Sequence, residues 1–166
     1  MSKTVSGCSL LLVLGAAILA GGCLGSAVDA REALSLAEVT TGWLPAESDA
    51  GNKIAPVLSF RLDNTGAAPL GVLQVNAVFR RAGEDLEWGS VLARAVGREG
   101  LAPGASAGPF TLRSERGYTG RQSSDTLLGH RDFVDVSVEL FVRHRADRWV
   151  RLGAFDIDRR LLAAAG

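Results

Sequence analysis

The residues best suited to bind a partner are concentrated between positions 113 and 124. This stretch holds Arg113, Arg116 and Arg121, together with Tyr118, which is the single tyrosine of the chain, and two glycines. Arginine recognises carboxylates and phosphates through paired hydrogen bonds, and arginine and tyrosine are enriched where proteins contact one another. Because long loops on rigid scaffolds often bind partners, we interpret the stretch as a candidate partner-binding loop. The alternative is a solvated connection between two sheets, with the tyrosine ring packed on the edge of the fold.

Residues that could perform catalysis are sparse. The two histidines, His130 and His144, lie among charged residues at expected strand ends, where an exposed and solvated side chain is expected. Asp156 and Asp158 share one face of a strand, but pairing with the arginines that follow accounts for them. The sequence contains no nucleophile elbow, phosphate-binding loop or dinucleotide fingerprint, and no cluster with metal-ligand spacing. We therefore expect no catalytic residue, metal or cofactor. Since 18 basic residues balance 18 acidic ones, nucleic acid is not an expected partner either.

The first part of the chain has the pattern of an export signal. Leu10–Ala20 is an apolar run, and Lys3 is the only charge before it. The run is too short for a membrane-spanning helix, which takes about 20 residues, but it matches the hydrophobic region of a secretory signal. The residues that follow, Leu19-Ala20-Gly21-Gly22-Cys23, resemble the lipobox of bacterial lipoproteins.

This resemblance implies that Cys23 is acylated and becomes the first residue of the mature protein. Leu24, in place of an aspartate, implies release to the outer membrane, with the domain facing the periplasm. The chain departs from the family pattern at Ala20, because leucine is strongly preferred three positions before the cysteine. The alternative is ordinary cleavage after Ala27 or Ala30, which would give a soluble secreted or periplasmic protein.

The rest of the chain shows the alternation of β-strands. Val57–Leu62 and Leu73–Arg80 each place apolar residues on one face and polar residues on the other. Asp63–Pro69, which joins them, is longer than a hairpin turn and suits a connection that changes sheet. About seven strands with turn signals between them predict an all-β antiparallel sandwich. The other expected strands are 34–44, 86–96, 109–113, 133–143 and 149–157; in the first, Ala37, Val39, Thr41 and Trp43 are expected to share a side.

A second resemblance concerns the turns. They look like those of the FxLYD-type and related immunoglobulin-like domains of bacterial envelope proteins over about residues 57–112; the matching residues are Asn64-Thr65-Gly66, Pro69-Leu70, Gly83 and Leu101-Ala102-Pro103-Gly104. The resemblance implies an immunoglobulin-like β-sandwich. It transfers no catalytic residue, and the acidic residue expected after the aromatic of the third strand is missing, because Phe79 is followed by Arg80.

These observations predict a signal peptide over 1–22, a lipid-anchored tether over 23–33, a β-sandwich over 34–160 and a tail over 161–166. We expect a non-enzymatic envelope lipoprotein, anchored to the membrane through Cys23, that acts as an accessory or protein-binding subunit of an envelope assembly. The alternative is a periplasmic carrier of a small molecule or lipid, which would need an apolar cavity between the sheets. Strands filled with valine, leucine and phenylalanine favour a solid core instead.

Overall fold

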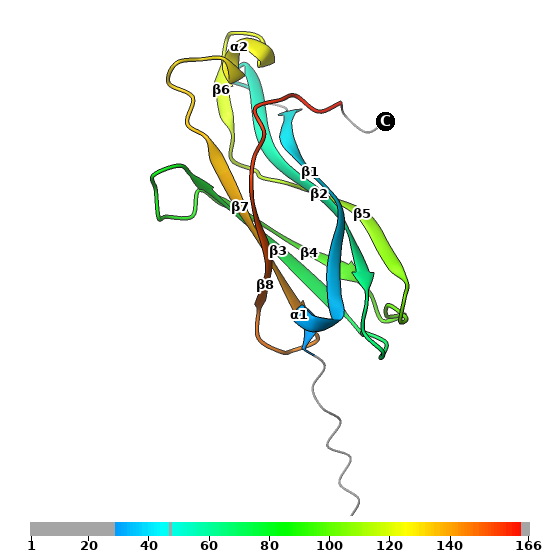
Figure 1. Ribbon diagram of the computed structural model, residues 1–166. Helices are drawn as coiled ribbons and strands as arrows, with labels where there is room; N and C mark the ends of the chain where they lie inside the picture. The colour runs from blue at the N-terminus through cyan, green and yellow to red at the C-terminus, as the bar shows by residue number, and fades with distance from the viewer. Residues whose placement is uncertain (1–28, 47, 164–166) are drawn as a thin grey trace, which may run out of the picture.

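Two antiparallel β-sheets pack face to face in the computed structural model, which describes residues 29–46 and 48–163 (Figure 1). One sheet has the order β1-β2-β5, with β6 also paired to β2, and the other has the order β4-β3-β7-β8. The predicted all-β antiparallel sandwich is therefore confirmed. The elements are α1 (Ala30–Ala33), β1 (Leu34–Ala46), β2 (Asn52–Asn64), β3 (Leu73–Arg81), β4 (Gly89–Val96), β5 (Ser106–Arg113), β6 (Tyr118–Gly120), α2 (Ser124–Leu128), β7 (Val136–His144) and β8 (Val150–Asp156).

The connections exchange the chain between the two sheets. The chain leaves the first sheet after β2, returns to it between β4 and β5, and leaves it again between β6 and β7. The connection expected at Asp63–Pro69 thus changes sheet, as its length indicated. Each exchange brings an apolar strand face onto the same interior, so the two sheets share one core.

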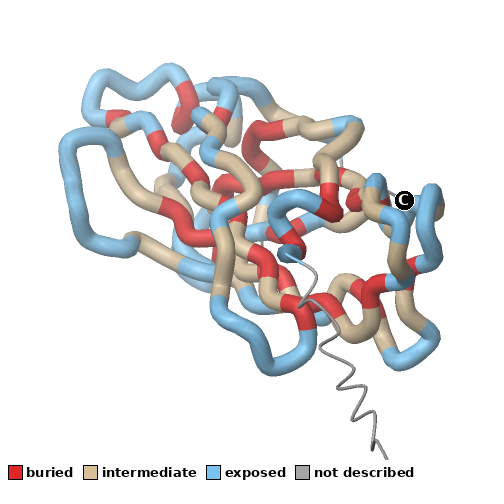
Figure 2. The backbone as a smooth tube through the Cα atoms, turned by 60° about the horizontal axis from the view of Figure 1, so that its bottom comes forward, coloured by how far each residue is buried: buried red, intermediate tan, exposed pale blue. Residues whose placement is uncertain are grey.

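The core follows the alternation of the sequence. Leu58, Phe60 and Leu62 of β2 are at most 1% exposed, and so are Val138 and Leu140 of β7. Figure 2 shows buried positions alternating with less buried ones along the strands. Each such side chain contributes roughly 1.5–3 kcal/mol by leaving water, so these two strands hold the sheets together.

The first strand departs from the predicted pattern because it contains a bulge. The register between β1 and β2 shifts between Ala37 and Thr40, and Glu38 has a left-handed φ of 51°. An extra residue reverses which face the following side chains occupy. Leu36 before the bulge and Val39 after it therefore pack against the same core, whereas Ala37 does not belong to it. The prediction that Ala37 shares a face with Val39 is wrong for this reason.

Both ends of the sandwich reach beyond the predicted domain bounds. Ala30 and Ala33 of α1 are only 6% and 4% exposed, and the Asp29 carboxylate accepts a hydrogen bond of 2.9 Å from the N–H of Arg31. The folded part thus begins inside the segment expected to be a tether. At the other end, the N–H of Leu162 donates to the carbonyl of Trp43 at 2.8 Å, so this part of the expected tail lies along β1.

The predicted signal peptide and Cys23 lie outside the described residues. Among the residues that are described, no helix has the length and apolar character needed to cross a membrane.

Candidate functional site

Part of the candidate segment is strand, since Arg113 ends β5 and Tyr118–Gly120 form β6. β5 and β6 both pair with β2, through Val57 opposite Arg113 and Ile54 opposite Tyr118. Between these two pairs lie two residues of β2 and four residues of the segment that joins β5 to β6, Ser114–Gly117, which form a bulge larger than the usual single extra residue. The crossing to the second sheet comes only after Gly120, through α2. The expected loop over residues 113–124 is therefore interrupted by the short strand β6, with irregular backbone on either side of it.

The bulge lies opposite a proline. In an antiparallel strand the N–H and the C=O of one residue point to the same neighbour. The carbonyl of Pro56 accepts a hydrogen bond of 3.0 Å from the N–H of Ser114. An N–H at position 56 would point to the same side, but proline has none, so the pairing hydrogen bond that it would donate is missing here. The bulge needs a glycine at position 117, because a Cβ there would lie 2.2 Å from the carbonyl oxygen of Ile54.

Tyr118 is part of an aromatic cluster. Its hydroxyl donates a hydrogen bond of 3.0 Å to the carbonyl of Val134. Its ring centroid lies 5.7 Å from that of Trp43, 5.3 Å from Trp88 and 4.8 Å from Phe133. Burial raises the pKa of Tyr118 above its ordinary value. The tyrosine therefore packs on the end of the sandwich, which is the alternative left open by the sequence.

The three arginines of the segment are exposed and point to different places. Arg113 lines an open hollow of about 940 Å³ with Lys53, whose ammonium donates to the carbonyl of Glu115 at 2.7 Å. Arg116 lies against the start of β4, and Arg121 follows β6. Within residues 29–46 and 48–163, no carboxylate is within ion-pair distance of any of the three. These guanidinium groups are thus available to an external anionic group, although they do not converge on a single point.

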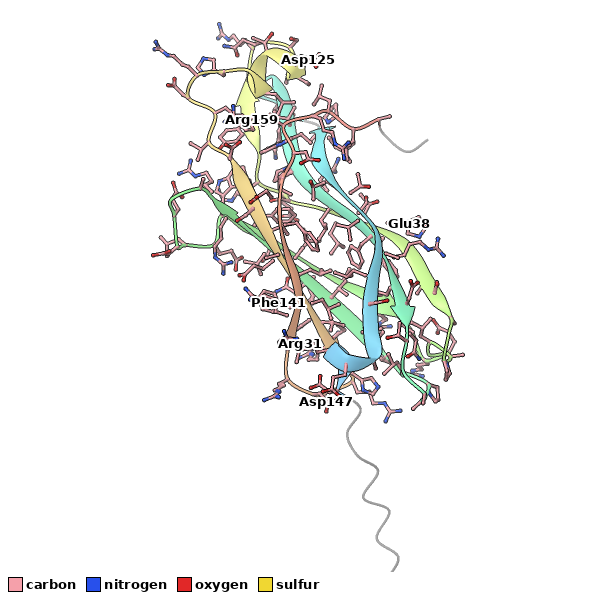
Figure 3. All side chains as sticks on the ribbon, viewed as in Figure 1. Arg31, Glu38, Asp125, Phe141, Asp147 and Arg159 are labelled. Atoms are coloured by element: carbon pink, nitrogen blue, oxygen red, sulfur yellow. The ribbon has the colours of Figure 1, made fainter. Side chains whose placement is uncertain are left out.

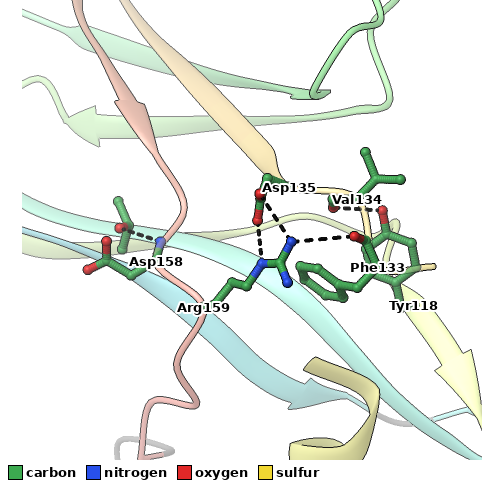
Figure 4. Close-up of polar contacts among 7 residues, drawn as sticks. Tyr118, Phe133, Val134, Asp135, Asp158 and Arg159 are labelled. Atoms are coloured by element: carbon green, nitrogen blue, oxygen red, sulfur yellow. Dashed lines mark hydrogen bonds and ion pairs between the residues drawn. The ribbon is translucent and has the colours of Figure 1, made fainter. Parts of the chain in front are cut away.

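A second polar group, beside Tyr118, was not predicted. Arg159 donates from Nε to Asp135 at 2.6 Å and from Nη2 at 3.1 Å, and its guanidinium lies 4.8 Å from the centre of the Phe133 ring (Figure 4). The hydrogen bond from Arg159 lowers the pKa of Asp135. The pair keeps this carboxylate in its charged form, which does not suit a general acid. Its role is structural: it attaches the C-terminal segment to the start of β7. The two residues are 24 positions apart, and no local pattern predicts their contact.

His130 precedes β7, and His144 is the last residue of that strand. His130 is exposed, as expected. The expectation for His144 is wrong, because it is only 7% exposed and its Nε2 accepts from the N–H of Gly71 at 3.1 Å. In the neutral ring Nδ1 then carries the proton, 3.6 Å from the carboxylate of Asp147. The buried His144 side chain therefore packs at the C-terminal end of β7. The described residues contain no cluster of three or more potential metal ligands.

The two ends of the sandwich are distinct. Arg31 and Asp147 lie at the end where the chain enters α1, whereas Asp125 and Arg159 lie near the opposite end (Figure 3). β6, α2 and the C-terminal segment gather at this second end (Figure 1). Tyr118 and Arg121 are thus far from the point at which the N-terminal segment joins the domain.

Comparisons with known proteins do not assign the chain to a family. No protein-family model matches the chain, and no curated protein matches it. Among solved structures, a Northeast Structural Genomics Consortium target, SoR45, has a TM-score of 0.44 at 12% identity and covers 76% of this chain and 87% of its own. A Bordetella pertussis target proposed to be ApaA has a TM-score of 0.41 at 19% identity and covers 75% and 91%. At these values the likenesses carry no inference about activity or partner.

Proposed function

We propose that the protein is a non-enzymatic, partner-binding subunit of a cell-envelope assembly, exported and held at a membrane by a lipid on Cys23. The observation that carries the proposal is the exposure of Arg113, Arg116 and Arg121 at or beside the ends of β5 and β6, with no carboxylate partner within the described residues. Arginine in such a position provides directed hydrogen bonds to acidic groups of another molecule. The remaining ion pairs, such as that of Arg159 with Asp135, serve the fold.

The placement of the N-terminus gives the anchored protein an orientation. Cys23 is only six positions before Asp29, and six extended residues reach roughly 20 Å. A lipid on Cys23 would therefore keep the α1 end of the sandwich close to the bilayer. The opposite end, with β6 and Arg121, would face away from the membrane, where a soluble domain of an envelope partner can reach it (Figure 1).

The carrier alternative receives less support. A carrier needs a cavity between the sheets, and large side chains occupy this interior; Phe60 and Phe79 are at most 1% exposed. One hollow of about 220 Å³ beside Tyr118, Leu127 and Phe133 opens at the end of the sandwich and not between its sheets. A melting temperature that rises when lipid extract is added to the purified domain would favour the carrier.

Photo-crosslinking in cells tests the proposal. Because Tyr118 is packed in the aromatic cluster, the probes belong at the exposed positions of Arg116 and Arg121, with a control at exposed Arg148 near the α1 end. We expect a discrete protein adduct from position 116 or 121 and none from 148. A lipid or small-molecule adduct would favour the carrier. No protein adduct from either test position would contradict the partner-binding function.

A further inference from the structure

The chain enters the sandwich through a short helix that lies against both sheets. Ala30 and Ala33 are three positions apart on one face of α1, and they are 6% and 4% exposed. They belong to the same buried cluster as Leu34, and α1 contacts β1 of the first sheet and β7 and β8 of the second (Figure 1). Arg31 and Glu32 are exposed. The helix therefore closes this end of the core.

Asp29 holds the turn of this helix together. Its carboxylate accepts from the N–H of Arg31 at 2.9 Å, and its carbonyl accepts from the N–H groups of Glu32 at 3.0 Å and Ala33 at 3.1 Å. The first N–H groups of a helix have no partner inside the helix, and an aspartate at the N-cap supplies one. Without Asp29, three N–H groups of the turn would lose their acceptors.

The connection between β2 and β3 packs onto the end of the helix. The carbonyl of Ala33 accepts from the N–H of Thr65 at 2.9 Å and from that of Gly66 at 3.3 Å. The approach is close, since a Cβ at Gly66 would lie 2.9 Å from the Cβ of Ala33. Asn64, only 1% exposed, fixes the connection, because its amide donates to the carbonyl of Leu101 at 2.9 Å. The helix and the connections from β2 to β3 and from β4 to β5 therefore form one hydrogen-bonded unit.

The sequence offers three peptide bonds at which an export signal could be removed. They are the bonds before Cys23, after Ala27 and after Ala30. A signal peptidase acts on an extended precursor and reads small residues next to the bond, so it does not recognise the fold. The product must nevertheless retain the residues that the folded domain uses. Cleavage after Ala30 would remove Asp29 and the buried Ala30 together.

We infer that residues 29–33 are an N-terminal clasp of the mature domain, and that export processing therefore hydrolyses the chain before Asp29, to leave Cys23 or Val28 as the first residue and not Arg31. Hydrolysis adds one water across the peptide bond, which leaves a carboxylate on the signal peptide and an α-amino group on the mature chain. The inference rests on the export in the proposed function. It does not depend on acylation, since both remaining sites leave the clasp intact.

Cleavage after Ala30 would weaken this end of the domain through three effects. The N–H groups of Glu32 and Ala33 would lose the carbonyl that accepts from them, and the core would lose the buried side chain of Ala30. The new α-amino group would be positive at the start of a helix, where the free N–H groups already carry partial positive charge. Thr65 would then donate to a carbonyl that the turn no longer fixes.

Mass spectrometry of the mature protein isolated from cells tests the processing site. We expect N-terminal peptides that begin at Val28 or at a lipid-modified Cys23, and none that begins at Arg31. Exported protein with Arg31 as its first residue would overturn the inference and leave export intact. A chain that stays uncut in the cytoplasm would overturn both the inference and the proposed function.

Asp29→Ala tests the clasp in the mature protein. We expect the melting temperature to fall by about 3 °C or more and the amides of Thr65 and Gly66 to exchange with deuterium about fivefold faster or more. Glu32→Ala is the matched control, because it removes an exposed carboxylate from the same turn. The amide of Leu162 at the opposite end should exchange at the wild-type rate in both variants. Equal melting temperatures of the two variants, or unchanged exchange at positions 65 and 66 in Asp29→Ala, would overturn the clasp.

Discussion

The hydroxyl of Tyr118 donates a hydrogen bond of 3.0 Å to the backbone carbonyl of Val134, 16 residues further along the chain. This hydrogen bond joins the two ends of the connection that leaves β6, passes through α2 and enters β7. With the ring packed against Trp43 and Phe133, it attaches that connection to the end of the sandwich. A tyrosine that the sequence assigned to partner binding thus packs into the fold instead.

Removal of the tyrosine side chain should therefore destabilise the domain. We expect Tyr118→Phe to lower the free energy of unfolding by about 1 kcal/mol, because the carbonyl of Val134 loses its donor. Tyr118→Ala should lower it by about 3 kcal/mol through loss of the aromatic contacts. Urea denaturation measures both, and Thr119→Ala, at an exposed neighbour on β6, should change stability by less than about 0.5 kcal/mol. A fully stable Tyr118→Ala variant would show that the ring does not belong to the core.

The bulge offers a second test. We expect Gly117→Ala to destabilise the domain by about 2 kcal/mol or more, because the added methyl group would lie 2.2 Å from the Ile54 carbonyl oxygen and must displace backbone. Gly129→Ala is the matched control, since its nearest contact would be an ordinary 3.7 Å. Equal unfolding midpoints for the two variants would mean that β5 and β6 are not held to β2 as described.

The sequence predicted the sandwich because alternation is a local signal. Leu58, Phe60 and Leu62 had to share a face in any strand, and the connection after them was too long for a tight hairpin. The polar composition of the candidate segment suggested a loop and hid the short strand β6 within it, while Pro56, opposite the bulge before β6, lies more than 50 positions earlier in the chain. A proline inside an otherwise regular strand pattern was the available signal for a bulge in the neighbouring strand.

Other features had no local signal. The bulge in β1 uses Glu38 at φ 51°, a conformation for which glycine or asparagine would be the usual indication. The contact of Arg159 with Asp135 depends on how β7 and β8 are paired. The edge position of β4 depends on the strand order, which alternation does not specify. Sequence reasoning therefore located strands well and failed where the topology brings distant residues together.

The Arg159–Asp135 pair should give acid-dependent stability. The pKa of Asp135 is lowered in the folded state, so its contribution is present above the unfolded pKa of about 3.9 and is lost as the pH falls through the lower folded value. We expect Arg159→Gln to return the pKa of Asp135 toward the ordinary value in an NMR titration of the carboxyl carbon. The stability difference from wild type should shrink as the pH falls below about 4.

A matched substitution tests whether that effect is local. Glu139 also has a lowered pKa, chiefly because Arg151 donates to it at 2.7 Å, with a further contribution from Arg80. Arg151→Gln should raise the pKa of Glu139 and leave that of Asp135 unchanged. An unchanged pKa of Asp135 in Arg159→Gln would contradict the pairing.

The N-terminal prediction requires its own experiment. We expect wild-type protein to incorporate an alkyne-labelled fatty acid and to sediment with membranes, and Cys23→Ser to lose the label, because the cysteine thiol is the acyl acceptor. Two or more chains are needed for lasting attachment, so the unlabelled variant should stay as a precursor or appear in the soluble fraction. Cys8→Ser is the control, since Cys8 is the other cysteine of the chain and lies in the expected signal peptide. Label and sedimentation that survive in Cys23→Ser would refute acylation at this position, and a mature N-terminus at Val28 or Arg31 would indicate ordinary cleavage after Ala27 or Ala30.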